Sequence, residues 1–328
     1  MKKGLLTMAG VLLTVSLVSA GTTVPVLAEE ETTLVYGSGD YTRINPAIDE
    51  HGEINILIFN GLTAHDGDNQ VVPGLAESWD FDDETNTYTF HMAEDAKWQD
   101  GEPVTAEDVK FTIEAIMDPE NGSENAPNYE DVEEINVIDD HTVAFKLEDK
   151  NVAFLDYMTM AVLPKHLLEG EDMQTSDFFR NPVGTGPYKI EEFNGVGVGY
   201  TLAANEYYRE DVPYDKINLL FMGDNSAKTM ALQSGQVDLV ENITNVADIQ
   251  DFQDNDDYTV DIASGVRCGF AWMNFDGVLG NKTLRQAILM AIDYDTICNS
   301  RTIGGLYTPG FSVLPPTLNY DYDKLENP

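Results

Sequence analysis

The sequence has few positive charges. Eighteen lysines and arginines stand against 58 aspartates and glutamates, so the formal net charge is −40 at pH 7. A field of this sign repels nucleic acid and disfavours acidic ligands, whereas cationic or zwitterionic ligands are tolerated. The alternative is that these carboxylates only form a solvated surface. On either interpretation, nucleic acid is not an expected partner.

Motifs of known chemistry are also scarce. The chain has no HExxH or GxSxG pattern and no P-loop, and its five histidines do not pair at helical ligand spacing. With 58 acidic residues, chance pairs of carboxylates are too common to indicate glycoside hydrolysis. We therefore expect no enzymatic activity, no metal site and no cofactor.

Cysteine is nearly absent. Only Cys268 and Cys298 occur, without a zinc-type spacing. In an exported protein they could form a disulfide, or both could be free buried thiols, and the sequence leaves both possibilities open.

The amino terminus is typical of a secretory signal, which we place at residues 1–28. Lys2 and Lys3 precede an uncharged, largely apolar run that ends in the small-residue exit Val26–Ala28. The alternative is an uncleaved anchor, because the run is long enough to cross a bilayer. Cleavage is favoured by the polar residues within the run, and it predicts a protein outside the cytoplasmic membrane.

Alternating strands and helices follow the signal. A capping pattern at Thr105 and Asp108 begins a helix with one apolar stripe. A second helix runs from Ser226, as its cap, to Ser234, and Gly235 ends it. A third, around Leu284–Ile292, is expected to bury its stripe on a core. Strands are expected at Thr33–Tyr36, Tyr88–Met92, Thr142–Leu147, Tyr188–Ile190, Ile217–Phe221 and Val237–Val240.

Five motifs carry a family resemblance. They are Val72–Trp79 (VPGLAESW), Asp100–Val109 (DGEPVTAEDV), Asn181–Ile190 (NPVGTGPYKI), Ala231–Leu239 (ALQSGQVDL) and Thr283–Asp293 (TLRQAILMAID). In this order they resemble the oligopeptide-, dipeptide- and nickel-binding proteins of ABC transporters, the extracellular solute-binding proteins of family 5. Relatives are longer, so the resemblance implies a chain truncated at its C-terminal end.

The resemblance implies a mixed α/β (α+β), periplasmic-binding-protein-like fold of type II, similar to cluster C. Such a protein has two lobes, and the second lobe would here be incomplete. The implied domains are residues 29–57 with 166–265 as lobe I, residues 58–165 as an inserted α+β subdomain, and residues 266–328 as the start of lobe II.

The resemblance also implies a ligand cleft between the lobes, where an extended peptide adds backbone hydrogen bonds to protein strands. Tyr129 either faces this cleft or is a surface tyrosine. Phe270 and Trp272 either contact the ligand or pack in a core. The candidate ligand-binding residues are Asp49, Glu50, His51, Gly52, Tyr129, Phe270, Trp272 and Asn274.

The implied function is an extracytoplasmic receptor that captures peptides and delivers them to a membrane permease and its ATPase. We expect a monomer. No cysteine near residue 28 could carry the lipid anchor of many relatives. The alternatives within this class are a nickel chelate, for which His51 is the candidate ligand, or an oligosaccharide. Those outside it are a secreted hydrolase or a sensory receptor.

Overall fold

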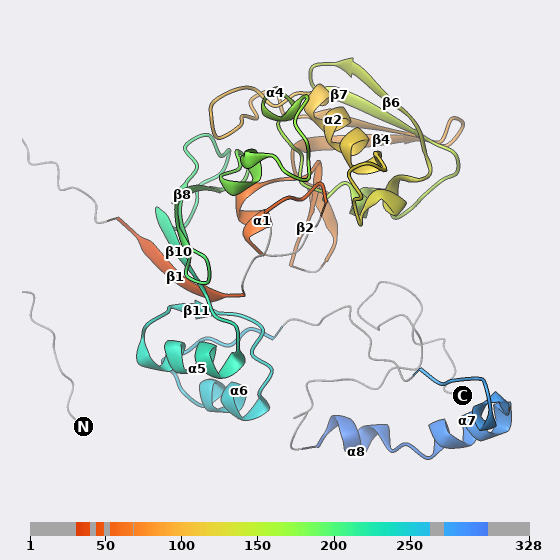
Figure 1. Ribbon diagram of the computed structural model, residues 1–328, viewed down its shortest axis with the longest axis vertical. Helices are drawn as coiled ribbons and strands as arrows, with labels where there is room; N and C mark the ends of the chain where they lie inside the picture. Colours follow the sequence, from red (N-terminus) through yellow and green to blue (C-terminus); the bar gives the residue numbers. More distant parts are fainter. Residues whose placement is uncertain (1–30, 40–43, 49–52, 68, 263–271, 301–328) are drawn as a thin grey trace, which may run out of the picture. The chain divides into compact units, whose positions relative to one another are not determined.

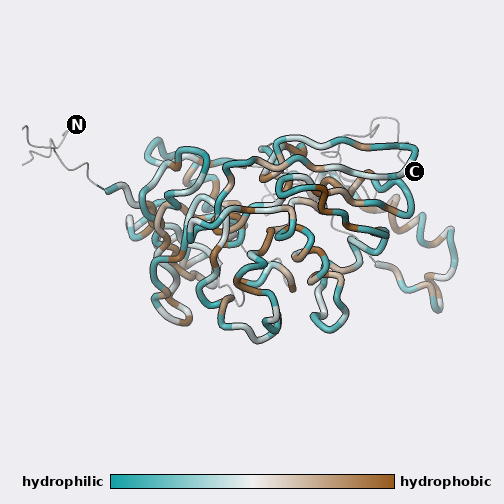
Figure 2. Tube along the Cα trace, turned by 90° about the horizontal axis from the view of Figure 1, so that it is seen from above, coloured by the Kyte–Doolittle hydropathy of each residue, from teal (hydrophilic) through white to brown (hydrophobic). Residues whose placement is uncertain are grey.

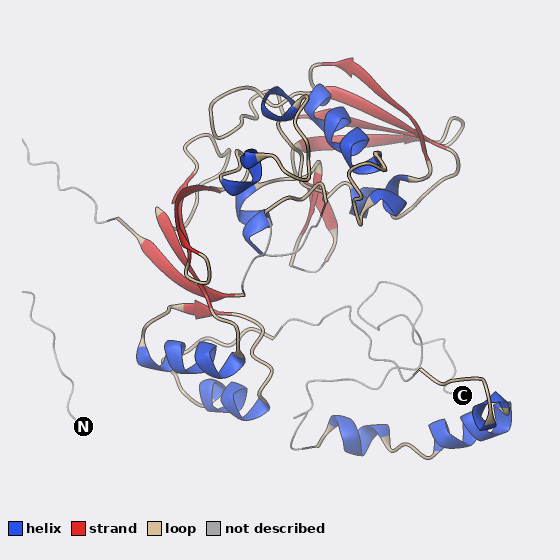
Figure 3. Ribbon diagram, in the orientation of Figure 1, coloured by secondary structure: helices blue, strands red, loops and turns tan. Residues whose placement is uncertain are grey.

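The computed structural model describes residues 31–39, 44–48, 53–67, 69–262 and 272–300. The chain divides into two compact units, Met1–Glu31 and Thr32–Pro328, and only Glu31 of the first unit is described. The signal expected at residues 1–28 thus lies outside the described residues. The helices and strands of the second unit are shown in Figures 1 and 3.

A five-stranded sheet brings the first strand next to strands from much later in the chain. Its order is β11-β1-β10-β9-β8, with β1 parallel to both β10 and β11, and β9 antiparallel to β10 and β8. Every strand expected in this part of the sequence is present, although the last is shorter than expected. The strands are β1 (Thr33–Ser38), β8 (Tyr188–Gly195), β9 (Gly199–Ala204), β10 (Lys216–Phe221) and β11 (Leu239–Val240).

A four-stranded antiparallel sheet is formed by the residues between β1 and β8. Its order is β4-β5-β7-β6. The alternation in β5 buries Tyr88, Phe90 and Met92 on one face, as the sequence predicts. The strands are β4 (Ala76–Asp82), β5 (Thr87–Met92), β6 (Val132–Asp139) and β7 (Thr142–Leu147), and a separate hairpin pairs β2 (Thr63–His65) with β3 (Val71–Pro73).

Helices and short 3-10 turns connect these strands. The α-helices are α1 (Glu53–Ile58), α2 (Ala106–Met117), α3 (Phe154–Tyr157), α4 (Lys165–Leu168), α5 (Asn225–Ser234), α6 (Val246–Gln253), α7 (Lys282–Met290) and α8 (Tyr294–Cys298). The 3-10 turns are η1 (Ala126–Tyr129), η2 (Asp177–Arg180) and η3 (Val278–Gly280). None of the described helices is both long and apolar enough to cross a bilayer.

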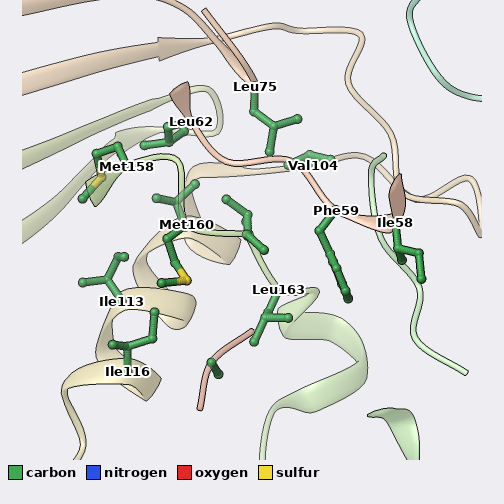
Figure 4. Packing of buried hydrophobic residues seen from close by; sticks show 14 of the residues in the cluster. Ile58, Phe59, Leu62, Leu75, Val104, Ile113, Ile116, Met158, Met160 and Leu163 are labelled. Carbon is green, nitrogen blue, oxygen red and sulfur yellow. The ribbon is translucent and has the colours of Figure 1, made fainter. Parts of the chain in front are cut away.

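Buried side chains from both sheets belong to one hydrophobic cluster. Figure 4 shows its centre, where Ile113 and Ile116 of α2 lie near Met160 and Leu163 of the segment that follows α3. Teal, hydrophilic residues predominate in the loops and turns of Figure 2. The domain boundaries expected near residues 57 and 165 are therefore not marked by separate cores, and the division into lobe I and an inserted subdomain stays a prediction.

The turn Asn181–Ile190 passes closely over the end of α1. The Gly186 N–H donates to the Ile58 carbonyl at 2.8 Å, which satisfies one of the carbonyls left open at the helix end. A Cβ on Gly184 would lie 1.9 Å from the Ile58 oxygen, and one on Gly186 would lie 2.6 Å from the Leu57 oxygen. The two glycines are thus explained by the close approach of two backbone segments.

Gln99 fastens this turn to the residues before α2. Its buried side chain accepts a hydrogen bond from the Gly184 N–H at 3.0 Å. Its Nε2 donates to the carbonyl oxygens of Tyr188, at 2.7 Å, and of Ile58, at 3.3 Å. A buried amide is costly when it lacks partners. Because both ends of the Gln99 amide have partners here, we expect other side chains at this position to destabilise the fold.

The predicted start of α2 is confirmed. Asp108 Oδ2 accepts from the Thr105 N–H at 2.8 Å, the reciprocal half of a capping box. The other oxygen of the same buried carboxylate accepts from the Lys165 N–H at 2.9 Å. Asp108 thus both caps α2 and ties the start of α4 to it.

The expected cap of the second helix, Ser226, was wrong. Helix α5 is capped by Asp224, whose Oδ1 accepts from the Ala227 N–H at 2.8 Å, and Ser226 lies inside the helix. Asp224 is the cap because its backbone is still extended, and from this position its side chain can accept a hydrogen bond from the first turn of the helix. Gly235, with a φ of 71°, ends the helix as predicted.

Helix α7 forms where expected but does not bury its apolar stripe. Leu284 and Ile288 are 40% and 38% exposed, and none of its residues is buried. The apolar spacing of a sequence specifies a face, and burial of that face requires a partner. Among the described residues no apolar partner covers α7.

Candidate functional site

The carboxyl ends of three parallel strands meet at one edge of the five-stranded sheet. Gly37 of β1 pairs with Leu220 of β10 on one side and with Val240 of β11 on the other. In open α/β sheets, ligands bind outside the carboxyl ends of the strands, where the strand order changes direction. The residues that end or follow these strands, Ser38–Gly39, Met222–Asp224 and Glu241–Asn242, are here called the carboxyl edge.

Glu241 is held in place at the carboxyl edge from two sides. The hydroxyl of the buried Ser38 donates to Glu241 Oε1 at 3.1 Å. Lys228 of α5 is also buried, and its Nζ donates to the backbone carbonyl of Glu241 at 3.3 Å. The carboxylate is therefore oriented by β1 while its backbone is held by α5. A carboxylate fixed in this way is suited to bind a cationic group such as an ammonium.

The loop that follows β11 and the helix α6 after it are each bound to α5 by one further hydrogen bond. Asn225 Nδ2 donates to Thr244 Oγ1 at 2.7 Å, and Thr229 Oγ1 donates to Asp248 Oδ2 at 3.1 Å. These contacts place α5 and α6 side by side, as Figure 3 also shows. The loop between them is consequently positioned by the helices as well as by the strand.

Five of the eight residues predicted from sequence to bind ligand lie outside the described residues. They are Asp49, Glu50, His51, Gly52 and Phe270. Their proposed contacts with a ligand stay predictions.

Tyr129 is a core residue. Its side chain is completely buried, and its hydroxyl donates to the Tyr157 carbonyl at 2.7 Å. The two rings also meet nearly edge-on, with centroids 6.3 Å apart. The expectation of a surface tyrosine was therefore wrong, because this hydroxyl finds a buried carbonyl partner. A role of Tyr129 in the cleft stays a prediction.

Trp272 and Asn274 are both exposed. The indole of Trp272 is 93% exposed, so the alternative of core packing does not describe it. Asn274 Oδ1 accepts from the Asp276 N–H at 2.9 Å and so stabilises a local turn. Cys298 is a free, partly buried thiol, whereas Cys268 lies outside the described residues.

Sequence reasoning missed Ser38, Lys228 and Glu241. The strands that carry Ser38 and precede Glu241 were both expected. Their parallel pairing is a long-range contact, which local patterns do not encode. The available signal was a polar residue at the end of one apolar strand, Ser38, and one directly after another, Glu241.

Three of the histidines are accounted for by neighbouring carboxylates. His65, His91 and His166 lie 3.0, 3.1 and 2.9 Å from an aspartate oxygen, on Asp156, Asp80 and Asp100 respectively. Within the described part of the chain, no three histidine, cysteine or acidic side chains converge as a metal site would require.

Comparison with known proteins gives a family match over most of the chain. Residues 70–328 match the sequence model described as bacterial extracellular solute-binding proteins, family 5 Middle. The oligopeptide-binding protein AppA of Bacillus subtilis is 29% identical over 302 residues, which are 88% of this chain and 55% of that protein. The chain therefore spans about half the length of the curated relatives it matches.

Solved structures show the same fold. The ABC transporter substrate-binding protein CtaP of Listeria monocytogenes superposes with a TM-score of 0.77 and 30% identity, covering 91% of this chain and 62% of that one. NikZ of Campylobacter jejuni, in complex with Ni(L-His), superposes with a TM-score of 0.70 and 31% identity, covering 82% of this chain and 55% of that one. The expected mixed α/β fold of a type II periplasmic binding protein is confirmed.

Proposed function

Because this chain belongs to the bacterial extracellular solute-binding proteins of family 5, we propose that it is a receptor of an ABC importer that captures peptides outside the cytoplasmic membrane. The similarity to the oligopeptide-binding protein AppA over 88% of this chain is the observation that carries the proposal. The receptor closes by a hinge motion around its ligand and passes it, chemically unchanged, to a membrane permease and its ATPase.

The carboxyl edge supports a ligand that carries a positive charge. Glu241 is oriented there by Ser38, and the net charge of −40 favours the approach of cationic or zwitterionic molecules. A free peptide amino terminus has this chemistry. Residues 49–52, which follow β1, would add the backbone pairing that lets one receptor accept many peptide sequences.

A thermal-shift titration of the full chain with defined peptide pools tests this function. A ligand that binds only the folded protein raises the melting temperature. We expect a shift with pools of free peptides and dissociation constants near the micromolar range, about −8 kcal/mol. Glu241→Gln should weaken binding of peptides with a free amino terminus more than of acetylated ones. The absence of a shift with every pool would refute peptide capture.

A nickel chelate is the second candidate ligand. The similarity to NikZ, whose structure contains Ni(L-His), favours it. His51 is the proposed contact. The same titration with nickel and L-histidine, together and separately, distinguishes the candidates. A shift that needs both components and is absent with peptides would replace the first proposal with the second.

We also propose that the receptor is a monomer, that residues 1–28 are its cleaved signal, and that it has no catalytic activity. The absence of a nucleophile motif in the sequence supports the last point. Incubating the full chain with generic peptide and glycoside substrates tests it, since any turnover would favour a secreted hydrolase. A receptor kinase gene beside this one, without permease genes, would favour a sensory role.

A further inference from the structure

Lys228 differs from the other cationic side chains in its surroundings. The residue is 7% exposed, and no other lysine or arginine among the described residues is buried. Within the described ranges no carboxylate oxygen lies within 4.0 Å of its ammonium group, although the chain has 58 acidic residues. Six partly exposed lysines do have such a partner, and they are Lys110, Lys146, Lys150, Lys165, Lys189 and Lys216.

The ammonium group of Lys228 therefore has open hydrogen-bond positions. A lysine ammonium offers three donors, and the partner found for them in the described part of the chain is the Glu241 carbonyl at 3.3 Å. A buried cation without a counter-charge is costly, because it loses water and gains no ion pair. An anionic group supplied by a ligand would complete this arrangement.

Lys228 reaches the carboxyl edge. Its helix, α5, begins directly after Asp224, and both Asp224 and the contacted Glu241 belong to this edge. The next residue, Asn242, has a φ of 55°, a left-handed conformation that residues other than glycine seldom adopt. Backbone strain of this kind is concentrated at ligand-binding segments. The position of Lys228 and the conformation of Asn242 are thus two separate indications of a ligand at the same place.

Glu241 fixes the spacing of the two charges that the carboxyl edge offers. Its carboxylate is oriented by Ser38, and its own carbonyl is the atom that Lys228 contacts. A cation bound at the Glu241 carboxylate and an anion bound at Lys228 would therefore be separated by no more than about two residues of chain, at about 3.8 Å per residue. The two termini of a dipeptide have this separation, whereas those of a long extended peptide do not.

We propose that Lys228 binds the carboxylate of the ligand, while Glu241 binds its ammonium group. The carboxyl edge then holds a compact zwitterion, such as a dipeptide, by both of its charges. This inference rests on the proposed function, ligand capture at the carboxyl edge, and adds to it a second charged contact and a limit on the distance between the charges.

Thermal-shift titrations of the full chain with two matched probes test the proposal. The first probe is a pool of dipeptides with alanine first and any residue second. The second is the same pool as carboxyl-terminal amides, which keep the amino terminus and lack the carboxylate. The readout is the ratio of the two apparent dissociation constants, because a change that only displaces Glu241 would weaken both pools equally.

Three variants accompany the native chain. Lys228→Met removes the charge and keeps a similar length, and Lys228→Arg keeps the charge. Lys110→Met is the control, since it removes a cation from α2, which contributes no residue to the carboxyl edge. Melting temperatures without ligand verify that each variant folds.

We expect the native chain to bind the free pool about tenfold more tightly than the amide pool, the effect of one hydrogen bond between charged groups. The preference should disappear in Lys228→Met, return largely in Lys228→Arg and persist in Lys110→Met. A native chain without the preference overturns the proposal, and this comparison requires no variant to fold. An unchanged preference in Lys228→Met overturns it as well.

Failure of this inference can be told apart from failure of the proposed function. Binding of longer peptide pools without any preference for a free carboxylate would overturn the role of Lys228 and leave peptide capture standing. The absence of binding by every pool, long or short, would refute both.

Discussion

Gln99 and Gly184 are joined by two hydrogen bonds. The Gln99 N–H donates to the Gly184 carbonyl at 2.9 Å, and the Gly184 N–H donates to the Gln99 side chain at 3.0 Å. The turn that precedes β8 is thereby fixed to the residues that precede α2. This double link connects the five-stranded sheet to the residues that lie between β1 and β8 in the sequence.

Replacing Gly184 should therefore be strongly destabilising. In Gly184→Ala the new Cβ would meet the Ile58 oxygen at 1.9 Å, which forces the turn away from α1. We expect a loss of about 3 kcal/mol in the free energy of unfolding, measured by denaturant titration. Gly67→Ala is the matched control, since a Cβ there meets no atom within 4 Å. Equal stability of the two variants would contradict the close approach.

Changing Gln99 to Glu tests its polarity. A carboxylate would face the carbonyl oxygens of Tyr188 and Ile58, which favours its protonated form and raises its pKa. The variant should lose about 3 kcal/mol at pH 7 and recover part of it near pH 4. A group whose folded pKa is raised in this way destabilises the fold increasingly as the pH rises. Gln99→Leu should lose about 2 kcal/mol at both pH values. A pH-independent loss in Gln99→Glu would be evidence against this arrangement.

Asp215 gives the fold an acid-sensitive contact. Its carboxylate accepts from the Thr32 N–H at 2.6 Å and from the Thr32 hydroxyl at 2.8 Å, and these bonds hold the pKa of Asp215 below the usual 3.8. A lowered folded pKa contributes stability above pH 3.8, which is lost as the pH falls through the folded pKa. The melting temperature of Asp215→Asn should therefore lie below that of the native chain at pH 5, with the gap closing near pH 2.

The exposed Asp211 is the control for this pH dependence. Asp211→Asn should follow the native curve throughout. If the difference in melting temperature between Asp215→Asn and the native chain stays constant down to pH 2, the stabilisation does not depend on an ionised Asp215 carboxylate.

The net charge predicts that salt stabilises the protein. The chain has 58 acidic side chains and only 18 lysines and arginines, so the carboxylates on average repel one another. This repulsion weakens as the Debye length falls from about 30 Å at 0.01 M salt to about 10 Å at 0.1 M. The melting temperature should rise over this range and change little with further salt. Sodium and potassium chloride should act alike. A flat or falling curve, or a response to one cation alone, would exclude general screening.

Much of the fold could be predicted from sequence, because its elements depend on local signals. The alternation in β5, the capping of α2 by Asp108 and the glycine at the end of α5 are each contained within a few residues. The carboxyl edge could not be predicted in the same way. Ser38 and Glu241 are brought together by strand pairing across some 200 residues of chain, and no local pattern specifies it.

The turn Asn181–Ile190 could be recognised from sequence, but the reason for its composition could not. Its prolines and glycines identified it as constrained, but the reason for the glycines is the approach of α1, which lies far away in sequence. The stripe of α7 was likewise visible, whereas its exposure depends on what packs there. Composition specifies what a segment can bury, and its neighbours decide whether it does.

The parallel pairing of β1 with β10 and β11 also bears on how the chain folds. Thr33–Ser38 leaves the ribosome first among the strands, yet both of its partners lie beyond residue 215. The high contact order of this arrangement predicts slow folding, with a long interval in which the first strand has no edge to join. The central sheet therefore cannot be completed until the residues of β11 have been synthesised, so the first strand waits through the synthesis of some 200 residues for its partners.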